Sequence, residues 1–200
     1  MNTIKSVTVK VNGHSINTLQ GGDFAGSSII FLHGKAFQAE TWLELGTLQA
    51  AIDAGFSVLA LDLPGFGKSP EADTGPEEVI SEVSRETDLE KFILVGPSMG
   101  GKIAMEYSLN HPDHVAGLVL IGAVGVAENR SRLGELPSSS LFIWGENDQI
   151  SDPDNGRLLH DSVDGSQLVL FKDAKHPCYL EQPELWHTTL LDFSKTVTIK

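Results

Sequence analysis

A serine between two glycines is the residue of this sequence best suited to act as a nucleophile. Ser98 lies in the segment GPSMGG at 96–101, after the apolar run 92–95 and before a segment with helical spacing. A G-x-S-x-G sequence between a buried strand and a helix is typical of a sharp turn that lifts a strained serine above the sheet. Gly96 and Gly100 would avoid clashes in such a turn. The motif favours covalent catalysis by Ser98 over a plain turn.

A serine hydroxyl needs a base, and an acid that orients the base, to react at neutral pH. Asp148 follows the apolar run 141–144, and His176 lies on the loop after the run 167–171. The carboxyl ends of parallel strands meet at one edge of a sheet, where the sites of open α/β sheets lie. We therefore predict that Asp148 orients His176 and that His176 deprotonates Ser98.

Other acids and histidines are alternatives for these roles. Glu146 and Asp152 flank Asp148 and could replace it, or could be solvated loop carboxylates. His33 follows an apolar run, and we expect it to shape the loop there. The other histidines lie in turns, at a helix end or inside helices, without the framework of a metal site: His14, His111, His114, His160 and His187.

Two backbone N–H groups are candidates for the oxyanion hole. Met99 begins the segment after the nucleophile, and Lys35 follows His33-Gly34 after the run 28–32. Donors in these two places stabilise the oxyanion of acyl transfer. The Lys35 side chain could bind an acidic group or be solvated. Three apolar residues near the motifs are predicted to line the pocket, with ordinary packing as the alternative: Phe37, Phe66 and Ile150.

Two glycine-lysine sequences raise the alternative of nucleotide binding. Residues 96–102 match G-x-x-x-x-G-K, but Ile103 follows, where a phosphate-binding loop needs Ser or Thr to hold Mg²⁺. Residues 67–69 have the required end of the motif, but Asp62 occupies the place of its first glycine. Neither segment therefore predicts a phosphate-binding loop.

The apolar pattern predicts the sheet that must position these groups. Short apolar runs alternate with helical spacing, which is typical of a mostly parallel sheet with helices on both faces. We expect about eight strands, of which the first two form a hairpin, over 7–11, 15–19, 28–32, 56–61, 91–95, 115–121, 141–144 and 167–171. Helices are expected over 41–54, 76–89, 98–110, 153–163 and 183–194.

Length, composition and charge limit the class of protein. The 200 residues, 40% hydrophobic and 20% charged, are typical of one globular domain spanning 1–200. The net charge of −13 disfavours nucleic-acid and membrane-surface partners. A single cysteine, Cys178, excludes an intramolecular disulfide and suits a reducing compartment. Without a signal-peptide pattern or an apolar run of membrane-spanning length, a cytoplasmic protein is expected.

Several motifs together resemble those of the α/β-hydrolase superfamily. In chain order they are His33-Gly34, DLPGFGKS at 62–69, GPSMGG at 96–101, Asp148 and His176. Three further segments resemble the α/β-hydrolase-domain protein 14 subfamily: Glu40-Thr41-Trp42, LGTL at 45–48, and 176–187, which opens HPCYL and ends Trp186-His187. The resemblance implies an α/β-hydrolase fold and a small capless protein with esterase-type activity. It also implies acyl transfer, with acetyl-lysine as donor and coenzyme A as acceptor in one alternative.

The expected function is that of a serine hydrolase acting on small esters, thioesters or amides, including an acylated peptide. Serine at the turn argues against the dehalogenases and epoxide hydrolases of the superfamily, in which an aspartate forms the ester. Residues 122–140 are too few for a cap domain, so we expect an open pocket. No metal or cofactor is expected. The alternatives are a protein-lysine deacetylase that passes the acyl group to coenzyme A, and a non-catalytic interaction module. A monomer or a homodimer fits this expectation.

Overall fold

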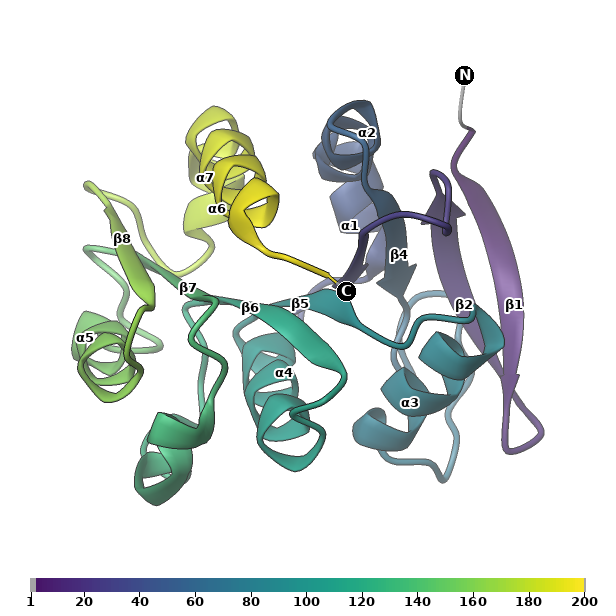
Figure 1. Ribbon diagram of the computed structural model, residues 1–200, viewed down its shortest axis with the longest axis horizontal. Coiled ribbons are helices and arrows are strands. Elements are labelled where there is room, and N and C mark those ends of the chain that lie inside the picture. The colour runs from purple at the N-terminus through teal and green to yellow at the C-terminus, as the bar shows by residue number, and fades with distance from the viewer. Residues whose placement is uncertain (1–2, 200) are drawn as a thin grey trace.

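The computed structural model describes residues 3–199, and its centre is an eight-stranded sheet (Figure 1). The strands are β1 Lys5–Val11, β2 His14–Gly21, β3 Ser28–Phe31, β4 Ser57–Leu61, β5 Phe92–Pro97, β6 Val115–Ile121, β7 Ser140–Gly145 and β8 Gln167–Phe171. Their order across the sheet is β1-β2-β4-β3-β5-β6-β7-β8. β2 pairs antiparallel with β1 and β4, and all other neighbours are parallel.

Helices cover both faces of the sheet (Figure 1). They are α1 Ala39–Glu44, α2 Thr47–Asp53, α3 Pro76–Glu86, α4 Met99–Asn110, the 3₁₀ helix η1 Arg130–Glu135, α5 Pro153–Ser162, α6 Cys178–Glu181 and α7 Pro183–Thr196. One core layer packs side chains of α3, α4 and α5 against the sheet, and the other packs those of α1, α2, α6 and α7. Every residue of β3, β4 and β5 is buried, because helices cover both faces of these central strands. Their sequences are therefore nearly continuous apolar runs.

The predicted fold class is confirmed, including the mostly parallel sheet and the absence of a cap domain, since residues 122–139 hold only η1 and loops. The prediction of one helix over 41–54 is wrong. Gly46 adopts a left-handed φ of 80° and separates α1 from α2. The short helices α6 and η1 were not predicted, because segments of four and six residues carry too little periodicity to be recognised.

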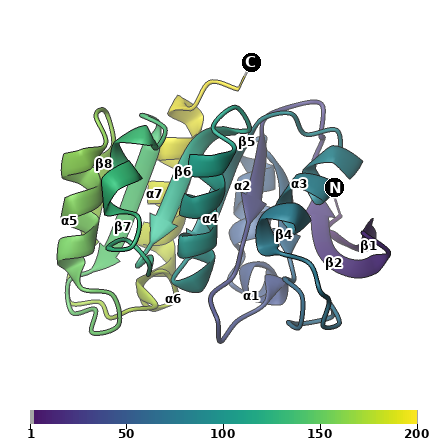
Figure 2. The ribbon, with the colours of Figure 1, turned by 90° about the horizontal axis from the view of Figure 1, so that it is seen from below.

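The predicted catalytic segments gather at one end of the sheet. Figure 2 shows α1, which follows β3, and α6, which follows β8, at the same end of the strands. The turn from β5 into α4 belongs to this end as well, because β3 and β5 are parallel neighbours. The fold therefore brings together loops that lie far apart in the sequence, as expected at the carboxyl edge of a parallel sheet.

Candidate active site

Ser98 lies in a strained turn between β5 and α4. Its backbone has φ 51° and ψ −113°, a conformation that L-residues rarely adopt. Its N–H donates to the carbonyl oxygen of Ile121, 2.9 Å away. A Cβ on Gly96 would overlap the carbonyl oxygen of Gly100, and one on Gly100 would lie 2.6 Å from the carbonyl oxygen of His33. Both glycines are therefore needed for the turn to close on itself and on the loop after β3.

The close approach at Gly96 predicts a large effect on stability. Gly96→Ala is expected to lower the free energy of unfolding by about 1–3 kcal/mol, because the added methyl meets backbone that cannot rotate away. Urea denaturation measures this change. Gly26→Ala is the matched control, since a Cβ there would be 3.6 Å from its nearest neighbour, and a change below about 0.5 kcal/mol is expected. Equal losses in the two variants would contradict the prediction.

His176 and Asp148 form a hydrogen-bonded pair. Nδ1 of His176 donates to Oδ2 of Asp148 at 2.7 Å. The other carboxylate oxygen accepts the N–H groups of Ile150 at 2.8 Å and Ser151 at 2.9 Å. The Asp148 side chain is fully buried, whereas that of His176 is 19% exposed. A Cβ on Gly122 would lie 3.0 Å from Oδ2 of Asp148, so the loop after β6 leaves just enough room for the pair.

Asp148 remains ionised in this environment. Burial alone would raise its pKa, but hydrogen bonds from His176 and from the N–H groups of Ser151 and Ile150 together lower the pKa below its usual value. The carboxylate accepts a hydrogen bond from Nδ1–H, so a neutral His176 presents Nε2 as an unprotonated acceptor. Glu146 and Asp152, the alternative acids, bind elsewhere, at the N–H of Asp173 and at the start of α5 respectively.

Ser98 and His176 line the same cavity, whose volume is about 240 Å³. Two of the residues predicted to line it, Phe37 and Ile150, do so, and so does Lys35. Its other lining residues are Gly34, Ala36, Pro97, Ile121, Pro177 and Tyr179. The candidate nucleophile, its base and one predicted oxyanion donor therefore share one small and largely apolar space.

Comparison with known proteins identifies the family. The family model described as "alpha/beta hydrolase fold" matches residues 28–133. Human ABHD14B is 29% identical over 197 residues, which cover 93% of each chain. Mouse ABHD14A is 33% identical over 175 residues, which cover 84% of this chain and 70% of the relative.

The chain belongs to the α/β-hydrolase family. The resemblance to the ABHD14 subfamily and the predicted enzyme class are thereby confirmed. The fold agrees with a solved structure, a predicted CIB-like hydrolase from Thermoplasma acidophilum, with a TM-score of 0.93 at 24% identity over 98% of this chain and 100% of the other.

Phe66, also predicted to line the pocket of this α/β-hydrolase, is not among the residues that line this cavity. Phe66 packs against His33, with ring centroids 4.8 Å apart, and is absent from the cavity wall. His33 is itself buried, donates from Nδ1 to the Gly34 carbonyl at 2.9 Å and accepts the Leu63 N–H at Nε2 at 3.1 Å. Burial lowers the pKa of His33, so it stays neutral and ties two loops together.

Asp62 is a structural residue of the hydrolase whose role the sequence did not reveal. Its buried carboxylate accepts Nδ2 of Asn17 at 2.8 Å and the N–H groups of Lys68 at 2.9 Å and Ala39 at 2.8 Å. It thereby holds the start of α1, and with it the loop that carries Lys35. The signal lay in the DLPGFGKS segment, which resembles a motif of the α/β-hydrolase superfamily.

The two predicted oxyanion donors of the hydrolase lie on different elements. Lys35 is on the loop after β3 and lines the cavity. Met99 is the first residue of α4, where the N–H groups of a helix have no partner within the helix. The positive end of that helix dipole lies beside Ser98, which favours negative charge at this position.

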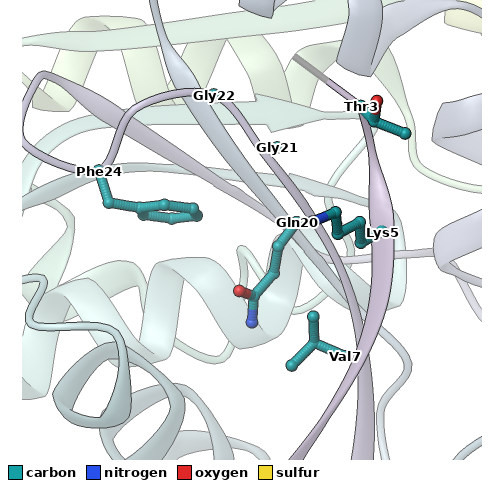
Figure 3. A pocket seen from close by; sticks show the side chains of 7 residues that line it. All are labelled: Thr3, Lys5, Val7, Gln20, Gly21, Gly22 and Phe24. Atoms are coloured by element: carbon teal, nitrogen blue, oxygen red, sulfur yellow. The ribbon is translucent and has the colours of Figure 1, made fainter.

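A second surface cavity of the hydrolase lacks this chemistry. It measures about 380 Å³ and lies beside β1 and β2 (Figure 3). Its wall consists of Thr3, Lys5, Val7, Gln20, Gly21, Gly22 and Phe24, which include neither a histidine nor a carboxylate. The catalytic candidates thus belong to the smaller cavity.

Residues 3–199 of the hydrolase contain neither a metal-binding cluster nor a membrane-spanning helix. Within this range, no group of three or more His, Cys, Asp or Glu side chains is arranged to hold a metal ion. No helix in the same part of the chain is both long enough and apolar enough to cross a membrane.

Proposed function

We propose that this α/β-hydrolase is a serine hydrolase that cleaves small acyl esters, thioesters or amides through an acyl-enzyme on Ser98. The observation that supports it best is the shared cavity of Ser98 and His176, together with the 2.7 Å bond that fixes His176 to buried Asp148. A nucleophile next to a base that a third group orients is the arrangement that activates serine.

The proposed reaction has two halves. Nε2 of His176 takes the proton of Ser98 while its Oγ attacks the carbonyl carbon, and the N–H groups of Lys35 and Met99 stabilise the oxyanion by roughly 3 kcal/mol each. The C–O, C–S or C–N bond breaks, and the leaving group takes the proton from His176. Water then loses a proton to His176 and attacks the carbonyl carbon of the acyl-enzyme. The bond between this carbon and Ser98 Oγ breaks, His176 returns the proton to Oγ, and the acid is released.

Cavity size favours short acyl groups. The volume of about 240 Å³ is below the roughly 300–1,000 Å³ of pockets that hold drug-sized ligands. Another cavity, of about 370 Å³, adjoins the small one and shares three of its lining residues, Ile150, His176 and Pro177. The other residues that line it are polar: Asn147, Gln149 and Lys175. His176 lines both cavities, whereas Ser98, which carries the acyl group, lines only the smaller one. We therefore assign the small cavity to the acyl group and this polar cavity to the leaving group.

Protein-lysine deacylation is a second candidate. The human relative ABHD14B is named, provisionally, for that activity. Ile150 is 69% exposed between the two cavities, so an acyl group could enter the small cavity while the rest of a peptide stays outside. In this variant the leaving group is the ε-amine of a lysine, and Ser98, His176 and Asp148 keep their roles.

Labelling by a fluorophosphonate tests the proposal without a known substrate. The Ser98 oxygen is expected to displace fluoride from phosphorus and give one adduct, which intact-protein and peptide mass spectrometry would locate. His176→Ala should slow labelling at least about 100-fold, since general-base catalysis typically contributes that much. Heat-denatured protein is the control and should stay unlabelled. A folded native protein without an adduct would contradict the proposal.

A further inference from the structure

The two tyrosines of this chain differ in how their hydroxyl groups are satisfied. Tyr107 shares hydrogen bonds with Ser81 at 3.2 Å and with Nδ1 of His114 at 2.8 Å. Tyr179, at the start of α6, lines the small cavity and is only 2% exposed. No hydrogen bond to its hydroxyl is found within residues 3–199. Tyr179 is thus a buried side chain whose polar end has no protein partner.

The Tyr179 hydroxyl is open to the cavity. Within the described range, Ser194 Oγ is the one fully buried side-chain polar atom without a hydrogen-bond partner. The Tyr179 oxygen has no partner either, so it must retain contact with solvent. Since the rest of Tyr179 is buried and the residue lines the cavity, that contact is made from the cavity. Burial raises the pKa of Tyr179, which keeps the phenol protonated at neutral pH.

Packing holds the Tyr179 ring in place. Its centroid lies 5.1 Å from that of Trp42, 6.1 Å from that of Trp186 and 6.4 Å from that of Phe37. Both indole N–H groups are bonded, to the carbonyl of Leu32 and to Thr47 Oγ1. A phenylalanine would satisfy the same aromatic contacts, so packing does not explain the hydroxyl. Because no protein group is bonded to this hydroxyl, it is free to form a hydrogen bond with a group bound in the cavity.

We propose that the Tyr179 hydroxyl binds a polar atom on the acyl part of the substrate. The site would then prefer short acyl chains that carry an ether, hydroxyl or keto oxygen over hydrocarbon chains of equal length. The acyl side is favoured because Tyr179 and Phe37 line the small cavity with Ser98 but are absent from the polar cavity assigned to the leaving group. This inference rests on the proposed function.

Matched esters and Tyr179→Phe test the inference. p-Nitrophenyl butyrate and methoxyacetate differ by CH₂ against O, and pentanoate and 4-oxopentanoate differ by a keto oxygen. Within at least one pair, the variant is expected to lower kcat/KM for the oxygen-bearing ester about three- to tenfold relative to its partner. Comparing each within-pair ratio between the two enzymes cancels the intrinsic reactivity of the esters. Tyr107→Phe is the matched control and should leave both ratios unchanged.

The outcomes separate this inference from the proposed function. Unchanged ratios in both pairs, with Tyr179→Phe still labelled by the fluorophosphonate, would overturn the inference alone. A folded native protein that is not labelled would overturn the proposed function, and the inference with it. If Tyr179→Phe does not fold, the native enzyme is measured alone. For each pair, the kcat/KM of the oxygen-bearing ester over that of its hydrocarbon partner is divided by the ratio of their rates of hydroxide hydrolysis. This corrected ratio should be about three in at least one pair, and a ratio near one in both pairs would overturn the inference.

Discussion

Ser98→Ala is expected to lower kcat for a short-chain p-nitrophenyl ester by roughly 10⁶-fold, close to the detection limit, and to abolish fluorophosphonate labelling. The reason is that the covalent route through an acyl-enzyme disappears with the hydroxyl. Alanine, like serine, carries a Cβ, so the backbone strain at φ 51° is about the same for both residues and the turn should persist. Steady-state kinetics and intact mass measure the loss, and circular dichroism checks the fold.

The control for this experiment is a serine outside the site. Ser131 is exposed in η1, more than 30 residues along the chain from Ser98, and makes no side-chain hydrogen bond among residues 3–199. Ser131→Ala should keep kcat within about twofold of the native value, because surface substitutions away from the site and the core change little. If Ser98→Ala folds and turns over the ester at the native rate, the covalent mechanism is wrong.

Local patterns predicted most of the fold and the elements that carry the candidate site. β6 and β8 have the bounds that their apolar runs predict. β6 is buried along almost its whole length, and a strand covered on both faces leaves a continuous apolar signal. The segment around Ser98 was recognisable because a tight turn between strand and helix demands small neighbours. These features depend on residues adjacent in sequence, which is why sequence alone reveals them.

The features that the sequence did not reveal depend on contacts between distant segments. The break at Gly46 separates α1, whose Trp42 packs on Tyr179, from α2, whose Thr47 bonds to Trp186, about 140 positions away. Phe66 lies in the DLPGFGKS motif, but its ring packs on His33 and not in the cavity. Side-chain direction and partners of this kind come from tertiary packing, which periodicity does not encode.

Asp148→Asn is expected to lower kcat by about 10⁴-fold while preserving the fold. The N–H groups of Ile150 and Ser151 both need the oxygen that now accepts them, so the asparagine must place its carbonyl there and its NH₂ toward His176. Nδ1 of His176 then has to accept a hydrogen bond, which moves the ring proton to Nε2. A protonated Nε2 in a neutral ring cannot take the proton of Ser98. Kinetics with the same ester measure the loss.

Glu146→Gln and Asp152→Asn are the controls for the Asp148 variant, since both acids flank Asp148 in the sequence. Glu146 accepts the N–H of Asp173 and Asp152 accepts the N–H of Asp154, so neither orients the histidine. Both variants should keep kcat within about threefold of the native value, because what they lose is local backbone support and not the tautomer of the base. A collapse of activity in either one, with Asp148→Asn nearly unaffected, would transfer the orienting role to that acid. Near-native activity in all three would instead mean that His176 holds its productive tautomer without a carboxylate.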